Sequence, residues 1–200
     1  MSDQFNNEDM LSPGNMLKLY SMGAFPMAEN KDDPEVNWYK PNKRAIIPLD
    51  NYNIPRSLKK ELRSGRFDIR INDDFDRVID GCADREETWI NGSLKDAYRR
   101  LFELGYLFTY EVFRGDDLLG GLYGINIGGA FFGESMFTKK SQGSKIALAF
   151  LIERLVKRGF VLLDVQLLNP HLELFGAVEI SEDEYNNLLV SALTTAVTFN

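Results

Sequence analysis

Three segments rich in aromatic and β-branched residues follow one another between residues 107 and 137, and this run limits the possible folds more than any other feature. The segments are LFTYEVF, DLLGGLYGINIG and AFFGESMF, separated by turns that contain glycine or aspartate. Such short turns are typical of antiparallel neighbours. Ser144–Arg158 has the apolar spacing of an amphipathic helix, and FVLLDVQLL is a continuous apolar run typical of a central strand. The order predicts three antiparallel strands, a helix and a further strand.

The preceding half of the chain contains shorter elements. GNMLKLYSMGAF predicts a short helix that stops at Gly23, and VNWY and RAIIPL predict short extended pieces. Further helices are expected over residues 55–64, from a cap at Asp73 or Asp74 through Cys82, and over 94–104 after a cap at Asn91 or Ser93; FDIRIN is expected to be a strand. We expect an α/β (α+β) fold with a small N-terminal domain over residues 1–48. Residues 49–200 would form a mixed sheet with flanking helices, in the strand order of the acyl-coenzyme A N-acetyltransferase (GNAT-type) core.

Composition removes several classes of protein. Of the 200 residues, 44% are apolar, and 23 basic side chains stand against 30 acidic ones, so the chain can bury a core. No stretch approaches the roughly 20 apolar residues of a membrane helix, and the start MSDQFNNEDM is acidic. We therefore expect a cytoplasmic protein with no membrane partner. The single cysteine, Cys82, and the single histidine, His171, exclude a disulfide framework and a His-rich zinc site, and we expect neither a metal nor a cofactor.

Positive charge is concentrated in one stretch although the chain as a whole carries a net charge of −7. Residues 54–70 carry six basic and two acidic side chains, a local charge of +4. Such a run is either a solvated helix face or a patch that contacts a phosphate backbone. The sequence alone leaves both readings open. The basic side chains are Arg56, Lys59, Lys60, Arg63, Arg66 and Arg70.

Polar side chains interrupt two of the apolar strands. Glu134 lies within AFFGESMF, and Asp164 and Gln166 lie two residues apart in VLLDVQLL, so both would point to one face of a strand. If these strands are neighbours, the three side chains line one pocket. The alternative is that each carboxylate is a structural group held by backbone amides or a lysine.

Other residues offer weaker indications of function. Trp38, Tyr39 and Trp89 lie in segments punctuated by proline and glycine, where an exposed ring could stack on a nucleobase, although core packing is the commoner role. KKSQGSK opens the long helix, and its free amides could receive a phosphate or simply begin the helix. Cys82 falls inside an ordinary helical pattern, so nucleophilic catalysis has little support.

Several motifs together resemble the leucyl/phenylalanyl-tRNA–protein transferase family. The likeness covers residues 16–190, and the combination of GESMF with D-x-Q-x-L-N-x-H is its most specific part. The other matching motifs are YSMGAFPM, NWYKPNKRAIIPL, RSLKK, TWI, DAY, the EVF and GGLYG strands, and SKIAL.

The resemblance implies an enzyme that moves leucine or phenylalanine from a charged tRNA to the α-amine of proteins beginning with arginine or lysine, which marks them for degradation under the N-end rule. Its partners would be aminoacyl-tRNA and these acceptor proteins, and we expect a monomer. The resemblance assigns Glu134, Asp164 and Gln166 to the reaction centre. It assigns substrate binding to Trp38, Tyr39, Trp89, Tyr98, Leu122, Phe131 and Met136, and the tRNA acceptor stem to Arg56, Lys59, Lys60 and Arg63.

An aminoacyl ester is already activated, so we expect positioning to dominate catalysis. Direct attack by the α-amine is expected, with Asp164 orienting the side-chain amide of Gln166 and the carbonyl oxygen of that amide holding the amine. Two alternatives remain open. One is an N-acyltransferase that uses acyl-coenzyme A, although the SQGSK turn lacks the usual phosphate loop, and the other is a non-catalytic module that binds RNA or protein N-termini.

Overall fold

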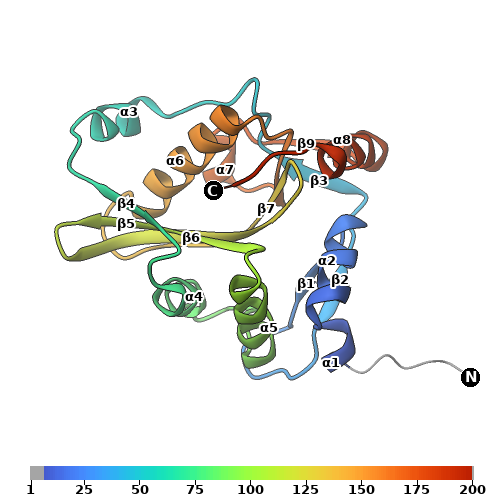
Figure 1. Cartoon of the computed structure of the whole chain (residues 1–200). Coiled ribbons are helices and arrows are strands. Elements are labelled where there is room, and N and C mark those ends of the chain that lie inside the picture. Colours follow the sequence, from blue (N-terminus) through green and yellow to red (C-terminus); the bar gives the residue numbers. More distant parts are fainter. Residues whose placement is uncertain (1–6, 200) are drawn as a thin grey trace, which may run out of the picture.

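A seven-stranded mixed sheet forms the centre of the protein, and helices cover both of its faces (Figure 1). The computed structural model describes residues 7–199; residues 1–6 and Asn200, at the outer ends of the two predicted domains, lie outside the described residues. The strands of this sheet, in chain order, are β3 (Lys43–Ile46), β4 (Asp68–Ile71), β5 (Leu107–Arg114), β6 (Asp117–Ile127), β7 (Ala130–Thr138), β8 (Leu162–Gln166) and β9 (Val178–Ser181). Their spatial order is β4-β5-β6-β7-β8-β3-β9. The predicted fold class is confirmed.

The predicted meander is also confirmed, because β5, β6 and β7 pair in antiparallel succession. The chain then crosses the sheet through helix α6 (Gly143–Arg158), and β8 returns parallel to β7. The β7–β8 pairing covers only Ala130–Phe132 and Leu162–Asp164. Beyond Phe132 and Asp164 the two strands no longer pair, so side chains further along face an opening between them.

Two glycines set how closely α6 approaches the sheet. A Cβ atom on Gly143 would lie 2.2 Å from the carbonyl oxygen of Leu119 in β6, and one on Gly120 would lie 3.0 Å from Gly143 Cα and 2.5 Å from the carbonyl oxygen of Phe137 in β7. The two shortest separations are too short for real atoms, so glycine at these positions allows the first turn of α6 to rest on β6. This contact fixes one wall of the opening beside β7.

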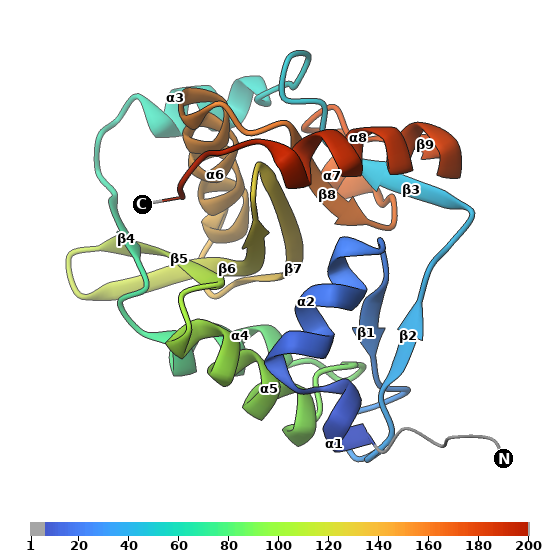
Figure 2. The ribbon, with the colours of Figure 1, turned by 45° about the vertical axis from the view of Figure 1, so that its right-hand side comes forward.

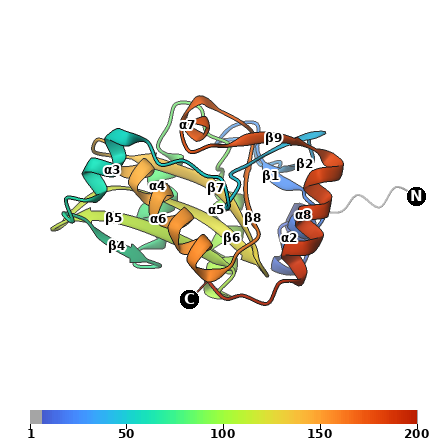
Figure 3. The ribbon, with the colours of Figure 1, turned by 90° about the horizontal axis from the view of Figure 1, so that it is seen from above.

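Each face of the sheet has its own apolar core. On one face α6 packs with α3 (Arg56–Leu62) and α7 (Pro170–Glu173), and the buried residues include Leu58, Ile146 and Leu172. Figure 3 shows α3 lying along α6. The other core joins α2 (Pro13–Ser21), α4 (Phe75–Ala83), α5 (Gly92–Glu103) and α8 (Glu182–Thr194), and it includes Met16 and Tyr98.

The N-terminal part is built from short elements beside α5 (Figure 2). It comprises α1 (Asn7–Met10), α2 and a two-stranded sheet of β1 (Phe25–Met27) and β2 (Asn37–Tyr39). Strand β3 lies before the predicted boundary at residue 48, yet it pairs with β8 and β9 of the large sheet. The N-terminal segment therefore contributes directly to the sheet that contains Asp164.

Helix capping settles two choices that the sequence left open. Asp74 accepts a hydrogen bond from the Arg77 amide and caps α4, and Asn91 accepts one from the Leu94 amide and caps α5. The elements β9 and α8 were not predicted, although Ser181 and Glu184 form a capping box at the start of α8. Within residues 7–199, no helix has the length and apolar character needed to cross a membrane.

Candidate active site

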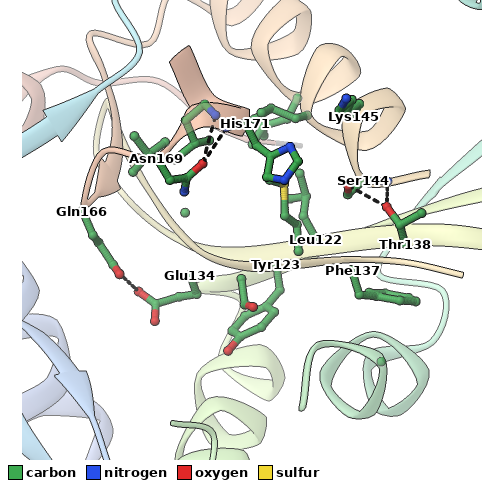
Figure 4. A pocket seen from close by; sticks show the side chains of 18 of the residues that line it. Leu122, Tyr123, Glu134, Phe137, Thr138, Ser144, Lys145, Gln166, Asn169 and His171 are labelled. Carbon is green, nitrogen blue, oxygen red and sulfur yellow. Dashed lines mark hydrogen bonds between the residues drawn. The ribbon is translucent and has the colours of Figure 1, made fainter. Parts of the chain in front are cut away.

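A cavity of about 980 Å³ opens where β7 and β8 part. Its walls come from β7, the start of α6, the end of β8 and the α7 segment, and from the loop before α5. Figure 4 shows Glu134 and Gln166 together at one end, Thr138 and Ser144 at the opposite end, and Leu122 between them. One end of the cavity is therefore set by a polar pair, and the middle is apolar.

Glu134 occupies an irregular position in β7. Tyr123 pairs with Ser135 and Gly124 pairs with Gly133, so Glu134 is the extra residue of a β-bulge. A bulge bends its strand and re-aims the side chain of the unpaired residue. Glu134 is only 7% exposed but still lines the cavity. The bulge thus explains how a strand residue reaches an opening beside its own sheet.

Neutral donors surround the Glu134 carboxylate. The Tyr20 hydroxyl donates to Oε1 at 2.9 Å, the Tyr98 hydroxyl to Oε2 at 2.7 Å, and the Gln166 side-chain amide to Oε1 at 2.8 Å. Burial raises the pKa of Glu134 to about 7, although the hydrogen bonds from Tyr98 and Tyr20 act to lower it. Burial also raises the pKa of both tyrosines well above its ordinary value, so they remain donors at neutral pH. Glu134 is consequently a carboxyl group that titrates near neutrality.

A charged donor holds the second carboxylate, that of Asp164. Arg44 of β3 donates through Nε at 2.9 Å and Nη2 at 2.8 Å, in the two-pronged geometry that suits a carboxylate. The Tyr185 hydroxyl donates to Asp164 Oδ2 at 2.6 Å. Asp164 has no exposed surface and does not line the cavity, whereas Arg44 is 2% exposed. Asp164 is therefore a buried anchor behind the cavity wall.

Gln166 connects the two carboxylates. Its backbone N–H donates to Asp164 Oδ1 at 2.8 Å, and its side-chain Nε2 donates to Glu134 Oε1. The expectation that Asp164 holds the side-chain amide directly is wrong, because Asp164 accepts the backbone N–H of Gln166 and Glu134 accepts the side-chain amide. Gln166 has a φ of +63°, in the left-handed region that non-glycine residues rarely adopt. This turn at the end of β8 brings the side chain onto Glu134, and the amide oxygen stays free to accept a hydrogen bond from a bound molecule.

The predicted apolar residues divide into two groups. Leu122 and Met136 line the cavity, as do Leu148, Leu151 and Leu163, which were not predicted as site residues. Phe131 does not line it; this ring is fully buried and stacks against Phe199 at a centroid distance of 5.2 Å.

The predicted aromatic residues also divide into those at the cavity and those away from it. Trp89 lines the cavity, and Tyr98 lies behind it as a donor to Glu134. Trp38 packs edge-on against Tyr20 at 5.8 Å, and Tyr39 is 42% exposed; neither lines the cavity. Trp89 is thus the only one of the four rings placed to meet a ligand in this cavity.

Arg85 was missed in the sequence. It lines the cavity and donates to the backbone carbonyl of Met136 and, at 3.3 Å, to the Ser135 hydroxyl. Its guanidinium lies 5.9 Å from the centre of the Trp89 ring. It therefore links the loop before α5 to β7.

The four basic residues predicted to contact tRNA are exposed on α3 and at its C-terminal cap. Lys59 and Arg63, together with Tyr52 and Glu153, line a separate hollow of about 410 Å³. The structure thus places this group outside the cavity. The four residues are Arg56, Lys59, Lys60 and Arg63.

Burial argues against chemistry at the lone cysteine. Cys82 is 1% exposed, and burial raises the pKa of its thiol to about 12, so it carries no thiolate at neutral pH. Among residues 7–199 no cluster of three or more His, Cys, Asp or Glu side chains is arranged to hold a metal ion.

A mixed sheet of this strand order, with a cavity where its two parallel strands part, defines the class of an acyltransferase-like protein. The family model of leucyl/phenylalanyl-tRNA protein transferase matches residues 46–190, and the model of the N-terminal domain of that family matches residues 9–42. The chain belongs to this family.

Two relatives support the assignment over nearly the whole chain. A leucyl/phenylalanyl-tRNA–protein transferase of Ruegeria sp. (strain TM1040) is 50% identical over 183 residues, which cover 92% of this chain and 87% of that protein. Another, from Cereibacter sphaeroides (strain KD131), is 47% identical over 189 residues, which cover 94% of this chain and 88% of that protein.

Among solved structures, L-PGS from Bacillus licheniformis is 10% identical to this chain, with a TM-score of 0.45. The match covers 80% of this chain and 52% of the L-PGS chain.

Proposed function

We propose that this enzyme transfers leucine or phenylalanine from a charged tRNA to the α-amine of proteins that begin with arginine or lysine. The observation that carries the proposal is the Gln166–Glu134 pair at one end of a cavity whose middle is apolar. The apolar part suits the side chain of the donor amino acid, and the polar end suits an amine. The family assignment supplies the reaction class.

The reaction joins two bound substrates without an enzyme-bound intermediate. The neutral amine attacks the ester carbonyl carbon, a C–N bond forms, and the C–O bond to the ribose breaks. The amine loses one proton and the departing ribose oxygen gains one. Because the ester is already activated, alignment supplies most of the acceleration, and alignment of two reactants is worth up to roughly 7–11 kcal/mol.

Gln166 performs the alignment. Its Nε2 is engaged by Glu134, so its Oε1 accepts the N–H of the incoming amine and directs the nitrogen lone pair toward the ester. An amide is not a general base, so Gln166 orients the amine and does not remove its proton. Glu134, which lines the same end of the cavity, also favours a cationic N-terminus when it is ionised.

The donor occupies the apolar part of the cavity. Leu122, Met136 and Leu148 contact its leucine or phenylalanine side chain. Trp89 stacks on the terminal adenosine, and Arg85 holds the loop that carries this ring close to β7.

The exposed basic residues of α3 hold the acceptor stem of the tRNA. If Arg56, Lys59, Lys60 and Arg63 contact phosphates, their replacement by alanine weakens tRNA binding and flattens its salt dependence. The matched control replaces four exposed basic residues elsewhere: Lys18, Lys31, Lys43 and Lys157. An unchanged salt slope in the α3 variant would return this face to a merely solvated helix.

A transfer assay tests the function directly. Labelled leucine on tRNA is expected to appear on an arginine-initiated peptide, and much less on one that begins with glutamate. Gln166→Ala is expected to lower transfer about 100-fold while tRNA binding stays unchanged. A chain that transfers nothing but is thermally stabilised by acetyl-coenzyme A would instead be an acyl-coenzyme A enzyme.

We further propose that the enzyme acts as a monomer in the cytoplasm, where charged tRNA and nascent protein N-termini meet. Residues 1–48 and 49–200 act as two domains joined through β3, and the reaction needs no metal or cofactor because both reacting groups arrive on the substrates.

A further inference from the structure

Arg44 lies outside the cavity, and no part of the proposed reaction yet uses it. Its guanidinium is 2% exposed and makes hydrogen bonds in two directions. Nε and Nη2 donate to Asp164, and Nη1 donates to the backbone carbonyl of Gly23 at 3.0 Å. The Phe25 and Tyr185 rings lie 4.5 and 5.0 Å from the guanidinium carbon. Arg44 is thus held by groups from the N-terminal part, β8 and α8.

A direct chain of hydrogen bonds runs from Arg44 to the cavity. Arg44 orients Asp164, Asp164 Oδ1 accepts the backbone N–H of Gln166, and Gln166 donates its side-chain amide to Glu134. The middle contact matters most, because Gln166 has a φ of +63° and L-residues adopt this conformation only when their surroundings impose it. The Asp164–Gln166 backbone contact, together with the hydrogen bond from the Leu167 N–H to the Val165 carbonyl at 2.8 Å, holds this turn and so directs the amide toward Glu134 and the cavity.

We infer that Arg44 is a positioning residue for transfer: it fixes Asp164 so that Gln166 presents its amide oxygen to the acceptor amine. The inference rests on the function proposed above. A lysine in place of Arg44 keeps the positive charge but lacks the planar fork that grips both carboxylate oxygens, so Asp164 can rotate. Gln166 then loses its backbone partner and relaxes toward ordinary φ values, and the amide moves off the cavity wall.

The experiment is a double-mutant cycle on the full chain. Arg44→Lys is made in the unmodified protein and in Gln166→Ala, and single-turnover transfer of labelled leucine to an arginine-initiated peptide is measured at saturating substrates. In the unmodified background we expect a loss of about 10- to 100-fold, with little change in KM for charged tRNA. In the Gln166→Ala background we expect a further loss of less than about threefold, because the side chain that Arg44 positions is already gone.

The matched control is Lys43→Met. Lys43 neighbours Arg44 on β3, but its side chain is 74% exposed and pairs loosely with Glu179, at 3.9 Å. Its replacement should leave transfer unchanged in both backgrounds. Circular dichroism and thermal unfolding establish that each variant is folded at the assay temperature.

Tyr185→Phe repeats the cycle with a milder change, which keeps the inference testable if Arg44→Lys does not fold. It removes one donor from Asp164 Oδ2 and retains the ring that packs against Arg44. A loss that is present only when Gln166 is intact supports the inference. Equal losses in both backgrounds, or no loss in the unmodified protein, overturn the role of Arg44 and leave the transferase proposal standing. Absence of transfer by the unmodified chain overturns the transferase proposal itself.

Discussion

The two buried carboxylates of the site lie on neighbouring strands, yet they differ in what surrounds them. Glu134 receives only neutral donors, from two tyrosines and an amide, and it lines the cavity. Asp164 pairs with the Arg44 guanidinium and is completely covered. Burial raises the pKa of Glu134 to about 7, and the hydrogen bonds from the two tyrosines offset this effect only in part. For Arg44, burial lowers the pKa but the Asp164 charge outweighs that effect, and the net pKa is raised.

This difference gives one carboxylate a structural role and the other a chemical role. A carboxylate with a fixed cation on it serves as a rigid support, because its charge is already matched and its oxygens are occupied. A carboxylate held by neutral donors can change its protonation state near pH 7 and so can respond to a substrate. Gln166 contacts both carboxylates. Asp164 holds its backbone rigidly, and the protonation state of Glu134 controls its side chain.

The largest expected effect comes from breaking the charged pair. Asp164→Asn leaves the buried Arg44 guanidinium without a counter-charge, and we expect the free energy of unfolding to fall by about 3–5 kcal/mol. The comparison variant, Glu134→Gln, removes no ion pair and also removes a charge whose burial is unfavourable at pH 7, so it should change the free energy of unfolding by less than about 1 kcal/mol. Urea unfolding measures both. Equal losses would mean that the two carboxylates do not differ as described.

The second effect is the pH dependence of stability caused by Glu134. Its pKa is about 7 in the folded protein against an ordinary 4.5, so between these pH values the folded state retains a proton that the unfolded chain has released. The free energy of unfolding therefore falls as pH rises from 4.5 to 7, by roughly 3 kcal/mol in total. Glu134→Gln should lack this contribution, and the difference between the two urea curves isolates it. A difference that is constant with pH would show that Glu134 is not the titrating group.

The third effect concerns the rate of transfer. When Glu134 is protonated, its own O–H donates to Gln166 Oε1, so the side-chain amide of Gln166 rotates. The NH2 group of Gln166 then faces the acceptor amine, and an NH2 group cannot accept the hydrogen bond that the amide oxygen would have accepted. Both the acceptor amine and Glu134 must then lose a proton for reaction, so below pH 7 the logarithm of the rate should rise with pH at a slope of about two. Glu134→Gln should give a lower rate and a slope of about one. The same slope in both proteins would remove Glu134 from control of the amide.

The smallest effect measures the backbone conformation of Gln166. Gln166→Ala and Gln166→Gly both remove the amide, so both should lose transfer. Glycine adopts a φ of +63° without the steric cost that alanine meets, so the glycine variant should be more stable than the alanine variant by about 1 kcal/mol. Identical stabilities would indicate that the chain relaxes once the side chain is removed, and that the Asp164 contact does not enforce the turn.

The sequence predicted the half of the site that depends on local order. GESMF and DVQ lie on strands joined by one amphipathic helix, and that connection places them side by side in a parallel pair. It could not predict the donors, because Tyr20 and Glu134 are 114 residues apart and Arg44 and Asp164 are 120 apart. The one local signal was an arginine at the head of the apolar run RAIIPL, where a buried charge requires a partner. The positive φ of Gln166 left no trace in the sequence.

Strand β3 ties the N-terminal part of the chain to the carboxylates of the large sheet. Arg44 of β3 holds Asp164, while Tyr20 of α2 reaches Glu134 from the N-terminal part. Replacing the N-terminal part by an unrelated segment would remove the Tyr20 hydroxyl from Glu134. It would also remove the Gly23 carbonyl from the guanidinium of Arg44, which holds Asp164. The N-terminal part and the large sheet therefore depend on each other for the hydrogen bonds that hold both carboxylates in place.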